Sequence, residues 1–97
     1  MALEPVYSPD VAKILDQIDD DPTRTALWNA ICDAIDLICD HSGSAQARRH
    51  ALRTTAGNTL WSVPVRYWAE DNDWVVLWRP RGDHALIAYI GPSTFHA

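Results

Sequence analysis

The segment Leu60–Trp68, LWSVPVRYW, decides the fold because apolar and polar side chains alternate along it. In an extended chain Trp61, Val63 and Val65 lie on one face, and the residues between them lie on the other. A period of two residues is typical of a β-strand with one buried face. Pro64 has no N–H to donate to a neighbouring strand, so we expect this segment to be an edge strand.

Two more segments downstream are rich in β-branched and aromatic residues: Trp74–Arg79 (WVVLWR) and His84–Ile90 (HALIAYI). Turn-like residues separate the segments at Ala69–Asp73 and Pro80–Asp83. The three segments together predict an antiparallel meander. Upstream of them, Leu52–Thr55 is compatible with either a further short strand or an extended strap.

Residues before this region follow a helical period instead. Ser8-Pro9-Asp10 combines an N-cap residue, a proline at the first helical position and an acid in the first turn, so it predicts a helix over Pro9–Asp19. Asp21, followed by proline, repeats this signal and predicts a second helix over Pro22–Asp40. The short link between them predicts an antiparallel helical hairpin. Pro5–Tyr7 is compatible with a short N-terminal strand.

A chain of 97 residues fits one domain. We therefore expect a single α+β domain over residues 1–97, with the order β-α-α-β-β-β. In this domain a helical hairpin, residues 9–40, packs on one face of a small three- to four-stranded antiparallel sheet, residues 52–90.

The charge is distributed unevenly along the chain. The formal net charge is −5, which by itself disfavours a nucleic-acid-binding function. However, residues 1–40 carry a net charge of −7, whereas residues 41–97 carry +2 and hold six of the seven arginines. Arginine matches phosphate and carboxylate oxygens with a bidentate fork, so the second half retains a possible anion-binding face.

Composition also bounds location and cofactors. No apolar run reaches the roughly 20 residues of a membrane span, and the first residues lack the pattern of a signal peptide. We therefore expect a cytoplasmic protein without a membrane partner. Cys32 and Cys39 are about 10 Å apart along one predicted helix, too far for a disulfide within it. Both are interpreted as reduced core residues, and we expect neither a metal nor another cofactor.

Five pieces of the chain, taken in order, are similar to a known family. These pieces are Val6–Pro9, Leu52-Arg53, Leu60–Val65, Trp74–Trp78 and Ile87–Gly91. With the helical hairpin between the first two, their order and spacing resemble the RelE/ParE superfamily of bacterial type II toxins. The resemblance implies a toxin that a cognate antitoxin protein holds inactive. RelE-like members cut mRNA on the ribosome, whereas ParE-like members have the same fold and inhibit DNA gyrase.

Metal-independent RNA cleavage needs cations that stabilise phosphate charge, a proton carrier and an aromatic surface for stacking. The second half of the chain contains these residue types. With the resemblance, the catalytic candidates are Arg53, Arg66, Arg79, Tyr89 and His96. The candidates for nucleic-acid binding are Arg48, Arg49, Arg81 and Trp68.

The chain also departs from the RelE-like pattern. Many members carry arginine where this chain has Pro64, and another where it has Trp74-Val75. Two functions therefore stay open. One is a RelE-like, ribosome-dependent endoribonuclease that inhibits translation. The alternative is a non-catalytic module of the toxin fold that acts by protein contact, as a gyrase inhibitor or a regulatory partner.

Overall fold

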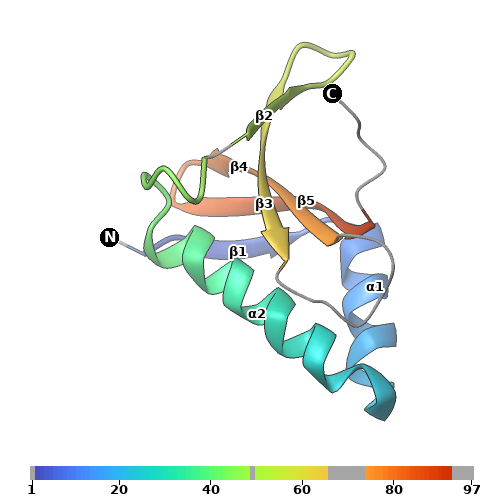
Figure 1. Ribbon diagram of the computed structural model, residues 1–97. Coiled ribbons are helices and arrows are strands. Elements are labelled where there is room, and N and C mark those ends of the chain that lie inside the picture. The colour runs from blue at the N-terminus through green and yellow to red at the C-terminus, as the bar shows by residue number, and fades with distance from the viewer. Residues whose placement is uncertain (1, 49, 66–73, 93–97) are drawn as a thin grey trace.

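The computed structural model describes residues 2–48, 50–65 and 74–92 (Figure 1). The elements in chain order are β1 (Glu4–Tyr7), α1 (Pro9–Asp19), the 3₁₀ turn η1 (Pro22–Arg24), α2 (Thr25–Asp40), β2 (His50–Arg53), β3 (Thr59–Val65), β4 (Trp74–Arg81) and β5 (His84–Pro92). The predicted layout, a first strand followed by two helices and then a run of strands, is confirmed, but β2 adds one strand to the predicted order. The prediction that spans residues 66–68 lies outside the described residues.

Helix α1 has the bounds that its cap signal predicts. The Ser8 hydroxyl oxygen accepts a hydrogen bond from the N–H of Val11 at 3.3 Å, and Pro9 occupies the first helical position. Because Val11, Leu15 and Ile18 recur at helical spacing, the helix buries one apolar stripe. The local signal and the tertiary packing agree, which is why the prediction is accurate here.

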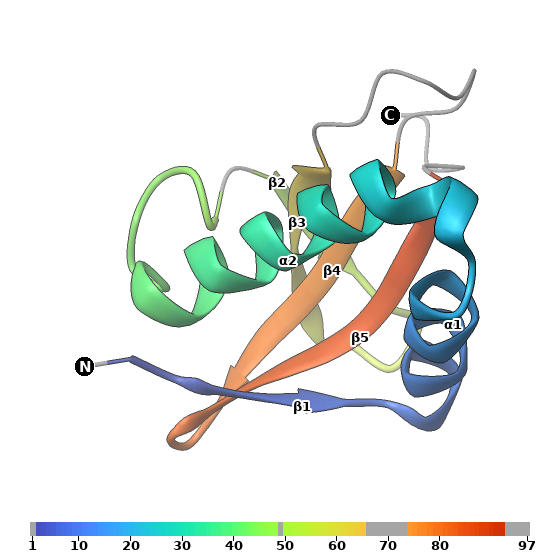
Figure 2. The ribbon, with the colours of Figure 1, turned by 90° about the horizontal axis from the view of Figure 1, so that it is seen from below.

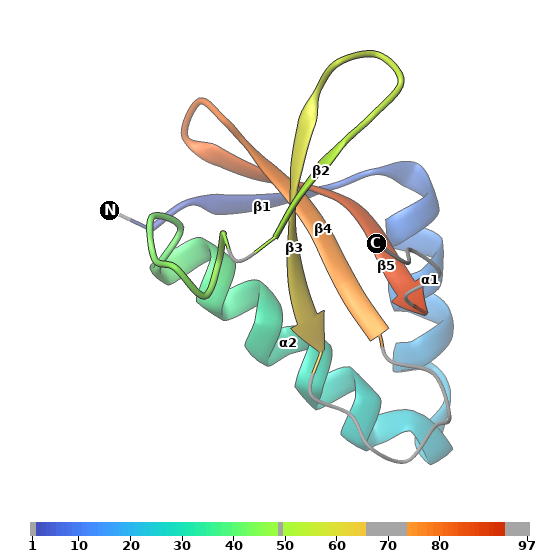
Figure 3. The same cartoon turned by 45° about the horizontal axis from the view of Figure 1, so that its top comes forward.

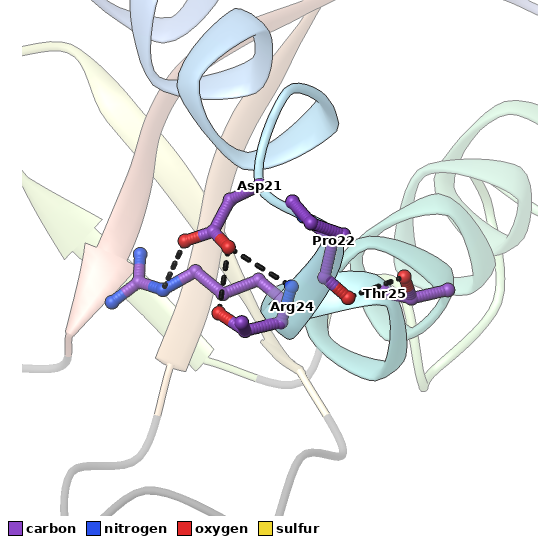
Figure 4. Close-up of polar contacts among 5 residues, drawn as sticks. Asp21, Pro22, Arg24 and Thr25 are labelled. Carbon is purple, nitrogen blue, oxygen red and sulfur yellow. Dashed lines mark hydrogen bonds and ion pairs between the residues drawn. The ribbon is translucent and has the colours of Figure 1, made fainter.

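The second predicted helix begins with a separate 3₁₀ turn. One Asp21 carboxylate oxygen accepts from both the N–H and the hydroxyl of Thr23, at 2.9 and 2.6 Å (Figure 4). The Thr25 hydroxyl donates to the Pro22 carbonyl at 3.2 Å, where the turn passes into α2. From this corner α1 and α2 diverge as the two arms of a V (Figures 1 and 3).

The sheet is mixed, with the strand order β1-β5-β4-β3-β2. The prediction of three or four antiparallel strands is wrong, because the described residues form five strands and β1 runs parallel to β5. Val6 lies opposite Leu86 in this pairing. Two helices and three strands separate the paired strands in sequence, so no local pattern could reveal their contact. Both helices cover the same face of the sheet (Figure 2).

Strand β1 turns alternate backbone groups toward β5. The N–H of Glu4 donates to the Asp83 carbonyl at 3.2 Å, and the N–H of Ser8 donates to the Ile87 carbonyl at 3.2 Å. Backbone groups of the intervening odd-numbered residues point away from the sheet. Pro5 is one of these outward-facing residues, so its missing N–H leaves the ladder with β5 intact.

Pro64 does not mark an edge strand, because β3 lies between β2 and β4. Strand β2 begins at His50, opposite Ser62, so Pro64 lies outside the part of β3 that pairs with β2. At the position that would pair with Pro64, the N–H of Arg48 donates instead to the Ser44 carbonyl at 3.2 Å. A proline is therefore tolerated in a central strand because only the other half of that strand is paired on both sides.

The core lies between the helices and the sheet. Strand β4 supplies Trp74, Val76 and Trp78, which share one face of the strand and belong to the core. The fully buried side chains that are largest by volume are Trp78, Ile18, Leu27, Ile31, Ile38, Ile87, Ile90, Val11, Val63 and Val76. Within the described residues, no helix has the length and apolar character needed to cross a membrane.

Candidate functional site

A β-bulge in β5 decides which residues face away from the helices. Leu77 pairs with Tyr89, but the next residue of β4, Trp78, pairs with Ile87, so Ala88 is the extra residue. The bulge lets Ile87 and Ile90 both face the core although they are three residues apart. It also turns Tyr89 to the sheet face opposite the helices, which we call the outer face.

Strict alternation along β5 would place Tyr89 on the face of Ala85 and Ile87, and the bulge turns it to the outer face instead. Its ring lies over Gly91, since a Cβ atom added there would be 2.6 Å from the Tyr89 hydroxyl oxygen. The hydroxyl donates to the Pro92 carbonyl at 2.8 Å. Tyr89 thus packs along the end of its own strand, and its hydroxyl proton is engaged in a structural hydrogen bond.

The two described arginines of β4 also lie on the outer face. Arg79 is half-buried opposite Leu86, and Arg81 is exposed opposite His84. The imidazole Nε2 of His84 lies 3.7 Å from a carboxylate oxygen of Glu4. This charged group therefore surrounds the turn between β4 and β5, whereas the Tyr89 side chain leans toward the opposite end of β5.

Arg48 lies on the helix side and serves the fold. Its Nε donates to the Ser42 carbonyl at 2.7 Å. Its guanidinium carbon lies 5.4 Å from the ring centre of Trp61 and 5.6 Å from that of Trp78. The indole N–H of Trp78 donates to the Ala47 carbonyl at 2.8 Å. The segment after α2 is thus held to the sheet both by this hydrogen bond and by the stacking of Arg48.

Arg53 lies on the opposite side of the sheet from Arg79. It is exposed at the end of β2 and pairs with Thr59, so alternation places it on the sheet side of Trp61 rather than of Arg79. Among the predicted site residues, Arg79, Arg81 and Tyr89 share a face, whereas Arg48 and Arg53 lie on the other side. The remaining predicted residues, Arg49, Arg66, Trp68 and His96, lie outside the described residues.

A groove that the sequence did not predict runs between α2 and the part of β3 that β2 does not pair with. Its volume is about 320 Å³. The groove is lined by Ala30, Asp33, Ala34, Leu37, Gln46, Val63 and Pro64. The four residues from α2 follow the spacing i, i+3, i+4, i+7, beside the stripe that fills the core. This second stripe was readable in the sequence, but its small alanines gave it a weak apolar signal.

Cys32, Cys39 and Tyr7 lie near one another and near the acids of α2. Burial raises the pKa of both thiols, and neighbouring carboxylates, Asp36 among them, raise it further. Burial raises the pKa of the Tyr7 hydroxyl too, with smaller contributions from the two thiols. Both cysteines are free, so they stay as protonated thiols at neutral pH.

The described residues contain no group of three or more histidine, cysteine or acidic side chains arranged to hold a metal ion. Comparisons of the chain with known protein families, with curated proteins and with solved structures find no match.

Proposed function

We propose that the chain is a toxin-like module of RelE/ParE type that acts by contact with another protein. The observation that carries this proposal is the dispersal of the described arginine and tyrosine candidates. Arg48 is stacked on two tryptophans, Arg53 lies on the opposite side of the sheet from Arg79, and Tyr89 donates its proton to a backbone carbonyl. RNA cleavage needs these groups to converge on one phosphate, whereas protein recognition does not.

The order of elements supports the family on which this proposal depends. The pieces of sequence that carry the resemblance fall in β1, β2, β3, β4 and β5, and two helices separate the first from the second. Each piece is thus part of a regular element in the expected order. Because one fold hosts several activities, this support extends to the fold and not to a choice of target.

Controlled expression in a bacterial host tests the proposal. We expect growth arrest that co-expression of a neighbouring antitoxin gene relieves, with unchanged mRNA 5′ ends across the transcriptome. A DNA-damage response that accompanies the arrest would identify gyrase as the contacted protein. Absence of arrest would contradict the toxin assignment, and codon-phased cuts in mRNA would contradict action by contact alone.

A specific observation favours the endoribonuclease as a second candidate. Arg79, Arg81 and Tyr89 lie on one face, and the described residues provide neither arginine with an ion-pair partner. The test is primer extension on mRNA bound to purified ribosomes. If this candidate is right, cuts appear with the wild-type chain and fall at least about tenfold with Arg79→Ala/Arg81→Ala. Asp16→Ala, on exposed α1 surface, is the matched control.

A further inference from the structure

The groove between α2 and β3 has the form of a docking site. Its floor is apolar, formed by Ala34 and Val63, both of which are buried. The volume of about 320 Å³ is at the lower end of the range for ligand pockets, which is about 300–1,000 Å³. It is large enough for apolar side chains of a partner and small enough to limit their number.

The wall of the groove formed by β3 includes a part of that strand that β2 does not pair with. Pro64 lines the groove at the point where β2 no longer accompanies β3. The N–H of Thr54 donates to the Asn58 carbonyl, so the backbone of Asn58 faces β2. Along β3 every second residue after Asn58 faces the same way, and Pro64 is one of these residues. The Pro64 carbonyl therefore faces the side on which the paired part of β2 does not reach it.

Among the residues that the structure describes, the charge on the groove lining is negative. Asp33 lies in the groove wall, and α2 also exposes Asp36 and Asp40. The sequence of α2 contains no lysine or arginine, and Gln46 on the facing segment is neutral. Arg48, which follows Gln46 by two residues, stacks on Trp61 and Trp78. Asp33 forms no ion pair with any residue that the structure describes.

We propose that this groove binds a partner protein through a short segment in which apolar side chains are flanked by lysine or arginine. The apolar side chains enter between Ala30 and Val63, and the flanking cations face the carboxylates of α2. This inference rests on the proposed function, since it names the chemistry of the contacted protein. It places the docking site on the acidic helical half of the molecule, away from Arg79 and Arg81.

Two short synthetic peptides with identical leucines test the proposal, one with lysines and the other with glutamates around them. Binding is measured by titration calorimetry and by amide chemical shifts of the isotope-labelled full chain. We expect the lysine peptide to bind at least about tenfold more tightly, to shift the amides of Ala30, Ala34 and Val63, and to weaken as salt rises.

Matched variants locate the binding. Asp33→Lys should weaken the lysine peptide about fivefold, whereas the same change on α1, Asp16→Lys, should leave it unchanged. Ala30→Trp should fill the groove and abolish binding, whereas Ala26→Trp at an exposed position of α2 should not. Because Asp33 and Asp16 are exposed, both charge variants retain the core and keep the test valid even if Ala30→Trp unfolds.

Three results would overturn the inference: no binding of the lysine peptide, equal binding of the glutamate peptide, or equal weakening by Asp33→Lys and Asp16→Lys. Failure of the proposed function looks different. If expression arrests no growth while the lysine peptide still binds in the groove, the toxin assignment fails and the docking site stands. If growth arrest by contact persists without peptide binding, only the docking site fails.

Discussion

The Tyr89 side chain occupies the space that a side chain at position 91 would need, so this position requires glycine. The Tyr89 hydroxyl oxygen lies 2.6 Å from the position of a Gly91 Cβ, closer than such atoms approach in proteins. The hydroxyl is also tied to the Pro92 carbonyl, which leaves the ring little freedom to move aside. The glycine is therefore required by packing, not by backbone conformation, because its φ is not positive.

Gly91→Ala should lower the free energy of unfolding by about 1–3 kcal/mol, since overpacking must displace the ring. Tyr89→Phe should cost about 1 kcal/mol through the lost hydrogen bond. In the Tyr89→Ala background the cost of Gly91→Ala should nearly vanish. Urea denaturation of the four chains of this double-mutant cycle measures the coupling, and additive costs would contradict the contact.

The thiols of Cys32 and Cys39 give a prediction on the alkaline side. Burial and nearby carboxylates raise their pKa above the ordinary 9.0, so the folded chain resists losing their protons. A raised pKa contributes stability that is present below the unfolded-state value and is lost as pH rises through the folded-state value. The unfolding free energy should therefore fall above about pH 9, and the fall should shrink in Cys32→Ser/Cys39→Ala. An unchanged pH profile in this variant would contradict the assignment.

At the scale of elements, the two helix starts depend on local chemistry. Ser8 caps α1 with a hydroxyl, and Asp21 caps η1 with a carboxylate. Because only the carboxylate gains a proton in acid, the two caps should respond differently to pH. Hydrogen bonds from Thr23, its side chain first and its backbone second, lower the pKa of Asp21. A lowered pKa contributes stability that is present above the unfolded-state value and is lost on acidification.

Ser8→Ala should cost about 1 kcal/mol of unfolding free energy, and its cost should not follow carboxylate titration. Asp21→Ala should also lower the thermal midpoint at neutral pH, but the difference from the wild type should shrink as pH falls below about 3.8. Thermal melts of the three chains between neutral and acid pH check this. An equal response of the two variants to acid would show that Asp21 does not cap as a carboxylate.

The strands show where sequence reasoning ends. Helix α1 was predicted to the residue because its cap and its apolar stripe are both local. Strand β5 does not alternate strictly, because the bulge at Ala88 inserts one residue and moves Tyr89 to the other face. The edge strand predicted from Pro64 is wrong, because β3 lies between β2 and β4, although β2 does not reach as far as Pro64. The parallel contact of β1 with β5 is a long-range pairing without a local signature.

The candidate site was predictable only in part for the same reasons. Residue types indicated an arginine-rich second half, and Arg79 and Arg81 do lie together on the outer face. The use of Arg48 against Trp61 and Trp78 could not be read from sequence, because it depends on how the segment after α2 folds back onto the sheet. The groove beside α2 could not be predicted from the sequence, because its lining combines residues from α2, the segment after it and β3.

For the whole molecule, one layer of helices covers one face of the sheet, so stability should be graded across the strands. Strand β4 lies at the centre and is buried through Trp74–Trp78, whereas β2 is an exposed edge. Hydrogen exchange should find the amides of Val76 and Trp78 exchanging only by global unfolding. The amides of β2 should exchange by local opening at lower free energy. Uniform protection of the two strands would contradict this gradation.

The outward-facing proline of β1 has a consequence for the behaviour of the protein at high concentration. Strands at the rim of a sheet can recruit other chains and seed fibrous aggregates when they offer a row of donors and acceptors. Between Glu4 and Tyr7 only Tyr7 offers an outward N–H, because Pro5 interrupts the row. The rim that carries the exposed apolar side chains of Val6 and Tyr7 is thereby a poor template for self-association.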